Sequence, residues 1–374
     1  MLWTGNSRNR DGTMKVYGSK ELKRDVIDRG LCIGCGACIG ICPYFETHKG
    51  KTAILFPCTL EQGRCFAHCP MVEVDLEALT QLWFGRSYDA SPLGPYSTIR
   101  TAKAGPKANA GDFQSGGTVS ALMDFALRQG TIDAAILTDQ DGILPFPRLV
   151  TDPADVYACA GSKYTSAPTL SELNRAIESG HRNLGLVVTP CQAMAVAQLK
   201  SNPLNEKDFT DPVTLVLGLF CTWSLNYRTF EPFLSEMVPI DTITKIDIPP
   251  PPAEVLEIYT DDEKIEVPLA EVREKVTDGC GHCPDMTAEF TDLSVGVFEG
   301  QNDLNTLIIR TDAGAELVAE AERDGYLILG DLPHENLDHL AGAAANKKKK
   351  ALSNDGKDAP PIFHFDQDIA EGLK

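Results

Sequence analysis

The stretch LGLVVTPCQAMAVAQLK, residues 184–200, joins an apolar run to a helix-forming segment through a cysteine. The apolar run is typical of a buried strand. Two further runs of the same kind occur nearby, IDAAILTD (132–139) and VTLVLGLF (213–220), and TVSALMDFALRQG (118–130) has the pattern of a helix. This alternation of strands and helices predicts an α/β fold with a mostly parallel sheet.

Cysteines follow two of these predicted strands. Cys191 follows the strand predicted at 184–190, and Cys221 follows the strand predicted at 213–220. Both thiols are therefore expected at the carboxyl edge of the sheet, where open α/β folds bind their ligands. Cys280 and Cys283, in CGHCPD, complete a set of four thiolates that suits a 4Fe-4S cluster. The alternative is a pair of buried structural cysteines beside a small zinc loop. Cys159 is left over, and we expect it to be a small core residue.

The N-terminal part contains a denser cysteine motif, LCIGCGACIGICPYF (31–45). Its spacing, C-x2-C-x2-C-x3-C-P, is that of one half of a two-cluster bacterial ferredoxin. Zinc sites usually pair C-x2-C units across a longer gap, so the motif favours iron–sulfur over zinc. The glycines between the cysteines let the backbone approach the cluster. The ligands predicted from this motif are Cys32, Cys35, Cys38 and Cys42.

The second half of this ferredoxin-like segment, FPCTLEQGRCFAHCP (56–70), has only three cysteines. In two-cluster ferredoxins the fourth cysteine of a motif ligates the other cluster. One cluster is then held by Cys32, Cys35, Cys38 and Cys69, and the other by Cys42, Cys58 and Cys65. Three alternatives remain for the second site. It takes a fourth ligand from elsewhere, it holds a 3Fe-4S cluster, or it is empty. The candidates for a fourth ligand are Glu61, His68 and Cys159. Two or three clusters are therefore expected in the chain.

Composition limits the class of protein. The net charge of −19 argues against nucleic-acid binding, and the 43% hydrophobic content is that of an ordinary globular protein. No apolar run of eighteen residues predicts a membrane span, and the polar N-terminus lacks a secretory signal, so a cytoplasmic protein is expected. The predicted domains are a ferredoxin-like domain (1–90), an α/β domain (91–335) and a polar C-terminal tail (336–374). Within the tail, Lys347–Lys350 is interpreted as a solvated helix end, with phosphate or partner docking as the alternative.

A Gly-Gly pair precedes the predicted helix at 118–130. Backbone N–H groups and the positive end of the helix dipole suit a phosphate there, although a simple turn has the same sequence. The segment GSKY (161–164) supplies a lysine and hydroxyls for the same ligand, or is a surface turn. No G-x-G-x-x-G follows a strand, and no hydrolase motif is present.

Taken together and in this order, the motifs resemble the family formed by the beta subunits of coenzyme F420-reducing hydrogenases and formate dehydrogenases. The resemblance rests on QSGGTVSAL (114–122), AGSKYTSAP (160–168), VVTPCQA (187–193), GLFC (218–221), CGHCPDMTAEFTDLSVG (280–296) and NTLIIRT (305–311). It implies an α/β domain that binds FAD beside a 4Fe-4S cluster and exchanges hydride with a deazaflavin coenzyme. The residues implied to contact the flavin are Gln114, Ser115, Gly116, Gly117, Thr118, Ser162, Lys163, Tyr164, Thr189 and Pro190, and those implied to hold the adjacent cluster are Cys191, Cys221, Cys280 and Cys283.

The sequence departs from the family pattern at Met286, where an aromatic residue is common, and in the incomplete second ferredoxin half. The function that we predict is an iron–sulfur flavoprotein subunit that moves electrons between a partner oxidoreductase, of formate dehydrogenase or hydrogenase type, and a soluble hydride carrier. The alternatives are a stand-alone ferredoxin-dependent reductase of an organic substrate and a non-catalytic electron-wiring adaptor. No catalytic acid or base is predicted.

Overall fold

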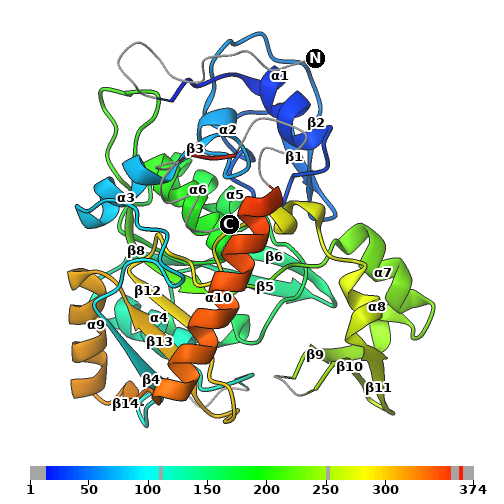
Figure 1. Ribbon diagram of the computed structural model, residues 1–374, viewed down its shortest axis with the longest axis vertical. Coiled ribbons are helices and arrows are strands. Elements are labelled where there is room, and N and C mark those ends of the chain that lie inside the picture. The colour runs from blue at the N-terminus through cyan, green and yellow to red at the C-terminus, as the bar shows by residue number, and fades with distance from the viewer. Residues whose placement is uncertain (1–13, 109–112, 250–252, 355–361, 365–374) are drawn as a thin grey trace.

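An eight-stranded mixed sheet lies at the centre of the computed structural model, which describes residues 14–108, 113–249, 253–354 and 362–364. Parallel pairs join β5, β7, β8 and β12, and antiparallel pairs add the outer strands on both sides. The α/β fold class is therefore confirmed, with the parallel pairing confined to the central strands (Figure 1). In spatial order the strands are β14 (Leu327–Asp331), β4 (Thr98–Ala104), β13 (Asn305–Ile309), β12 (Leu293–Val297), β8 (Val213–Leu219), β7 (Leu184–Val188), β5 (Ala134–Asp141) and β6 (Leu144–Val150).

Helices cover both faces of this sheet, and the strands alternate between two cores. Ala134 and Ile136 of β5 pack with the helices of one face, whereas Ala135 and Leu137 pack with those of the other, as the two-residue period of a strand requires. One face carries α5 (Thr169–Glu178) and α6 (Pro190–Lys200), and the other carries α4 (Thr118–Gln129) and α9 (Asp312–Arg323).

The N-terminal part packs on the face that α5 and α6 cover. Its buried side chains, such as Ile39, Phe45 and Val74, belong to the same core cluster as Leu173 of α5 and Val196 of α6. The cysteine-rich segment and the α/β sheet thus share one core. The elements of this part are α1 (Ser19–Leu22), the π-helical turn Lys23–Ile27, β1 (Phe45–His48), β2 (Lys51–Ile54), α2 (Arg64–Ala67), β3 (Val74–Asp75) and α3 (Leu76–Phe84), and β15 (Phe363–His364) pairs with β3.

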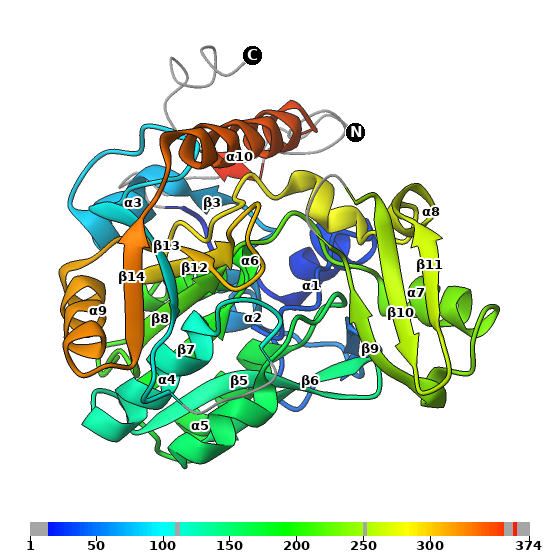
Figure 2. The same cartoon turned by 90° about the horizontal axis from the view of Figure 1, so that it is seen from below.

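A third core lies at the end of the molecule beyond β6, where Figure 2 shows a small separate sheet. It is an antiparallel sheet in the order β11-β10-β9, packed against two helices. This sheet was not predicted from the sequence, because its strands carry many exposed and charged side chains. Its elements are α7 (Tyr227–Ser235), β9 (Ile243–Asp247), β10 (Val255–Thr260), β11 (Lys264–Pro268) and α8 (Leu269–Arg273).

The C-terminal helix α10 (His334–Asn354) crosses the front of the molecule in Figure 1. Its lysine run, Lys347–Lys350, is not a fully solvated helix end. The interpretation of this run as solvated was therefore wrong for two of the four residues. Lys348 is buried and Lys347 half-buried, because both ammonium groups are hydrogen-bonded inside the protein. Lys349 and Lys350 are exposed. Among the described helices, none is both long enough and apolar enough to cross a membrane.

Candidate functional site

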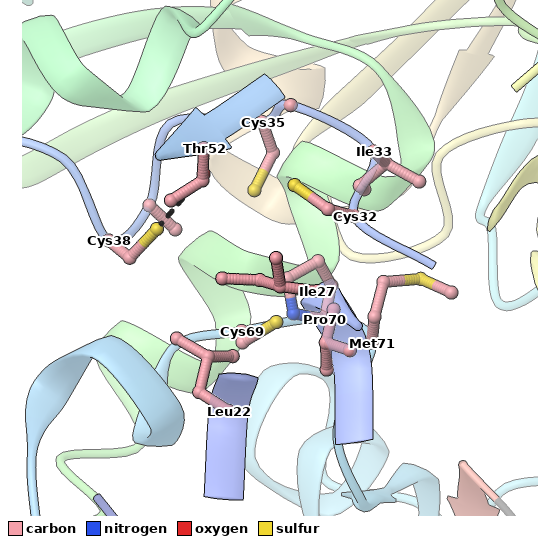
Figure 3. A pocket seen from close by; sticks show the side chains of 13 residues that line it. Leu22, Ile27, Cys32, Ile33, Cys35, Cys38, Thr52, Cys69, Pro70 and Met71 are labelled. Carbon is pink, nitrogen blue, oxygen red and sulfur yellow. Dashed lines mark hydrogen bonds between the residues drawn. The ribbon is translucent and has the colours of Figure 1, made fainter. Parts of the chain in front are cut away.

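The first cysteine group lines one cavity. Figure 3 shows the thiols of Cys32, Cys35, Cys38 and Cys69 around a shared space, together with apolar side chains. Burial raises the pKa of Cys38 to about 12, and it also raises the pKa of Cys35 and of Cys69 well above the usual thiol range. The four residues are those that the ferredoxin exchange predicted as one set, and the structure brings all of them together.

Helix α5 holds the loop that carries this group. The backbone N–H of Leu170 donates to the carbonyl of Cys35 at 3.1 Å. The buried side-chain amide of Asn174 donates to the carbonyls of Ala37 and Ile39 at 3.1 and 2.7 Å. The cysteine loop is therefore fixed by an element of the α/β sheet, not only by its own turns.

We expect Asn174→Ala to weaken this attachment and to lower the iron content of the first group. The substitution leaves two carbonyls without their donor, and an unsatisfied buried polar group costs about 1–3 kcal/mol. Urea unfolding and iron analysis of the anaerobically purified protein measure both effects. Asn336→Ala is the matched control, because Asn336 also donates to a backbone carbonyl but its hydrogen bond is exposed. Equal effects of the two substitutions would contradict the anchoring role of Asn174.

The second cysteine group comprises Cys42, Cys58 and Cys65. Burial, with contributions from the thiols of Cys42 and Cys58, raises the pKa of Cys65 to about 11, so these three thiols are neighbours. Of the candidates for a fourth ligand, Glu61 is exposed. His68 is buried and lines a different cavity of about 560 Å³.

The third cysteine group comprises Cys191, Cys221, Cys280 and Cys283. Burial raises the pKa of Cys191, and the thiols of Cys283, Cys221 and Cys35 add to this shift. Cys191 lies in the first turn of α6, where its thiol is 3.3 Å from the hydroxyl of Thr189. Cys280 and Cys283 lie on the turn η4 (Asp278–His282) and just after it. The structure therefore brings together the four thiols that the sequence assigned to one cluster.

The three cysteine groups are neighbours in space, in the order second, first, third. Cys65 of the second group is among the thiols that raise the pKa of Cys38 and Cys69 in the first. Cys35 of the first group in turn raises the pKa of Cys191 in the third. Cys159 is outside all three, because the charged groups near its thiol are Asp139, Arg148, Lys163 and Asp155. Among the described side chains, no three His, Cys, Asp or Glu residues converge tightly enough for a single metal ion.

A buried ion pair supports the segment that follows the third group. Lys348 Nζ donates to Glu289 at 2.6 Å and to the carbonyl of Ser91 at 2.9 Å, and both side chains of the pair are at most 4% exposed. Burial alone lowers the pKa of Lys348, but Glu289, Tyr88 and Asp285 together outweigh it, and the net pKa is raised. The lysine is therefore charged at neutral pH.

Breaking this pair is expected to be more damaging than removing it. Burial already raises the pKa of Glu289 to about 7, so Lys348→Met leaves a buried carboxyl that either stays charged without its partner or takes up a proton, and breaking a buried pair in this way costs about 3–5 kcal/mol. The double substitution Lys348→Met with Glu289→Met leaves no buried charge at the pair, so we expect it to recover most of that loss. Chemical unfolding of the four proteins of the cycle tests this, with the exposed Lys349→Met as the control. A double variant less stable than Lys348→Met would refute the argument.

The residues implied to contact a flavin lie around the start of α4. The side-chain amide of Gln114 donates to Tyr164 Oη at 2.8 Å and to Asp247 at 2.5 Å, and it accepts from the backbone N–H of Ser162 at 2.7 Å. Asp247 belongs to β9 of the small sheet, and sequence reasoning missed it because KIDIPP carries no recognisable motif. Gln114, Ser162 and Tyr164 are thus brought together, and the small sheet contributes a carboxylate to them.

The remaining residues of that set are held by nearby segments. Asn305 Nδ2 donates to the hydroxyl of Ser115 at 3.1 Å, and Asn305 Oδ1 accepts from the backbone N–H of Thr118, which follows Gly116 and Gly117. Thr189 and Pro190 begin α6 beside Cys191. Lys163 Nζ donates to the carbonyls of Cys159 and Ala160 at 2.6 and 2.9 Å, so its own loop binds its ammonium group. None of the residues implied for the flavin lines either cavity mentioned above.

Comparison with known protein families identifies three matching regions. Residues 99–174 match the family model "Coenzyme F420 hydrogenase/dehydrogenase, beta subunit N-term", and residues 181–335 match the model of its C terminus. Residues 25–44 match a 4Fe-4S binding domain, which includes the loop of the first cysteine group. Together the matches extend from the ferredoxin-like segment to the end of the sheet.

Individual relatives match over much of the chain. The coenzyme F420 hydrogenase subunit beta of Methanothermobacter thermautotrophicus is 29% identical over 70% of this chain and 95% of its own. The F(420)H(2) dehydrogenase of Methanosarcina mazei has a subunit that is 29% identical over 92% of this chain and 97% of its own. Among solved structures, a chain of the F420-reducing [NiFe] hydrogenase complex from Methanosarcina barkeri matches with a TM-score of 0.65 and 26% identity, over 70% of this chain and 92% of that one.

Proposed function

Because the chain belongs to the family of coenzyme F420 hydrogenase/dehydrogenase beta subunits, we propose that it is an iron–sulfur flavoprotein that exchanges electrons between a partner oxidoreductase and a soluble hydride carrier such as coenzyme F420. It is an electron-transfer subunit of this family with a 4Fe-4S binding domain. Its binding of FAD, its partner oxidoreductase and its hydride carrier are what we propose beyond the family. The single observation that supports them best is the succession of three cysteine groups from the N-terminal part to the edge of the α/β sheet.

The cysteine residues fit iron–sulfur clusters by their chemistry. In the first and the third group, four thiols come together, and burial raises the pKa of most of them, so they are protonated at neutral pH in the absence of a cation. Bound iron would make them thiolates, since a coordinating thiol is deprotonated. We assign the first cluster to Cys32, Cys35, Cys38 and Cys69, the third to Cys191, Cys221, Cys280 and Cys283, and the incomplete second one to Cys42, Cys58 and Cys65.

The flavin would be held between the start of α4, the loop 160–164 and the start of α6. Gln114 and Tyr164 fix one wall through their hydrogen bonds to Asp247. Thr189 and Pro190 place the other wall directly before Cys191. Gly116, Gly117 and Thr118 begin a twelve-residue helix, whose positive end suits the diphosphate of FAD. Bound there, FAD supplies the conversion between hydride and single electrons.

Anaerobic purification with iron, sulfide and flavin quantitation on the same sample tests the proposal. One FAD with about twelve irons is the count for three four-iron clusters, and about eleven would indicate a three-iron cluster in the second group. In the double variant Cys280→Ser with Cys283→Ser, we expect the loss of about four irons. A colourless wild-type protein with zinc in place of iron would refute the redox function.

A second experiment addresses the hydride carrier. We expect the loaded protein, reduced by an artificial one-electron donor, to reduce coenzyme F420 faster than a nicotinamide at equal concentration. Loss of absorbance of the oxidised deazaflavin measures this rate directly. A preference for the nicotinamide would overturn the proposed carrier but not the electron-transfer role.

A further inference from the structure

Helix α10 presents one polar face to the third cysteine group. Lys347 Nζ donates to the backbone carbonyls of Cys221 and Asp285 at 2.6 and 2.7 Å. Two turns further along, Asn354 donates to the carbonyl of Gly281, within the turn of Cys280 and Cys283, at 3.1 Å. Lys347 and Asn354 are seven residues apart and so lie on the same face of the helix. Both views show α10 alongside this turn (Figures 1 and 2).

The charge of Lys347 is not cancelled where it binds. Both of its acceptors are backbone carbonyls, so no carboxylate is hydrogen-bonded to the ammonium group. The Asp285 carboxylate is nearby, but it accepts from the backbone N–H groups of Thr287 and Glu289. The ammonium group of Lys347 lies against the backbone of Cys221, one of the four cysteines, and against that of Asp285, two residues after Cys283.

We propose that Lys347 is a positioning residue that raises the reduction potential of the cluster held by the third cysteine group, with α10 as the element that fixes its charge. This inference rests on the proposed function. One-electron reduction of a cluster adds a negative charge to the thiolate-bound iron, and a nearby fixed positive charge stabilises that reduced state. Net charge and hydrogen bonding around a cluster are among the factors that set its potential.

The sequence gives no independent indication of this role, because Lys347 stands in a run of four lysines. The run nevertheless supplies its own control. Lys349 is exposed and shares the same helix, so a charge change there alters the same region without reaching the cysteine group.

An EPR-monitored redox titration of the purified full chain, with dithionite as the reductant, tests the inference. The signal of the third group is identified first, as the one missing from the Cys280→Ser, Cys283→Ser double variant. We expect its midpoint potential to become more negative in Lys347→Met and Lys347→Gln. It should stay near the wild-type value in Lys347→Arg, which keeps the charge, and in Lys349→Met.

Two other results would overturn the inference, and a third would overturn the proposed function. An unchanged midpoint in both neutral variants would overturn the inference. Loss of the third cluster's iron from both neutral variants, with retention in Lys347→Arg, would show that Lys347 closes the site without tuning it and would also overturn the inference. Failure of the proposed function is recognised separately, since the double serine variant would then lose no iron relative to wild type.

Discussion

The substitution Gly36→Ala is expected to separate the first cysteine loop from α5 and to abolish iron binding by the first group. Gly36 has a φ of +86°, and a Cβ atom there would lie 2.5 Å from the carbonyl oxygen of Pro168 and 2.8 Å from the backbone nitrogen of Ser171. Both neighbours are backbone atoms, which a side-chain rotation cannot move. The left-handed backbone costs about 1–2 kcal/mol, and the overlap adds about 1–3 kcal/mol or more.

Gly180→Ala separates these two contributions. Gly180 has nearly the same φ, +89°, but a Cβ atom there would meet nothing within 4 Å. We therefore expect Gly180→Ala to show only the cost of the left-handed backbone and to keep its full iron content. Urea unfolding and iron analysis of both variants make the comparison. If Gly36→Ala retained its iron and were no less stable than Gly180→Ala, the contact between loop and helix would not matter for cluster binding.

The substitution Arg310→Met is expected to destabilise the protein by at least about 3 kcal/mol, because each buried acceptor left unpaired costs about 1–3 kcal/mol. The Arg310 side chain is buried, and its guanidinium donates to the carbonyls of Leu93, Pro95 and Thr287 and to the hydroxyls of Thr287 and Ser294. Burial lowers its pKa to about 10, so it remains charged at neutral pH.

The urea midpoint at an unchanged m-value measures this loss of stability. Arg323→Met is the control, since Arg323 is an exposed arginine on α9 and its removal should change stability by no more than about 0.5 kcal/mol. A loss below about 1 kcal/mol in Arg310→Met would contradict the role of Arg310 as the link between the segment 93–95 and the chain around Thr287.

The central part of the fold could be predicted because its strands are short, apolar and buried. The runs at 132–139, 184–190 and 213–220 became β5, β7 and β8, the helix predicted at 118–130 became α4, and the helix-forming segment that ends at residue 200 became α6. The antiparallel pairs on both sides were not predicted, since strand direction depends on connections that local apolar patterns do not record. The small sheet was missed for a different reason: β9 has no fully buried side chain and β11 has one, so neither carries the apolar run of a buried strand.

The cysteine groupings could be predicted from spacing, whereas the contacts that support them could not. Cys69 joins the first group although it is distant in sequence, as the ferredoxin exchange requires. No pattern in the sequence indicates that Asn174 binds the first loop or that Lys347 binds beside the third. The sequence does not distinguish a buried lysine from a solvated one within the run of four. Whether a lysine of α10 is buried depends on the segments that pack against the helix and not on the residues of the helix itself. The assignment of the cysteines as ligands and the domain limits stay predictions.

The attachment of the first cysteine loop to α5 has a consequence for the order in which the protein is made. Asn174 lies 137 residues after Ala37, the loop residue whose carbonyl it binds. When the N-terminal part leaves the ribosome, the helix that fixes its loop has not yet been synthesised. The loop therefore reaches its final shape only after α5 has folded against the sheet. We therefore expect delivery of iron and sulfide to the first group to follow translation of the α/β part instead of accompanying synthesis of the motif.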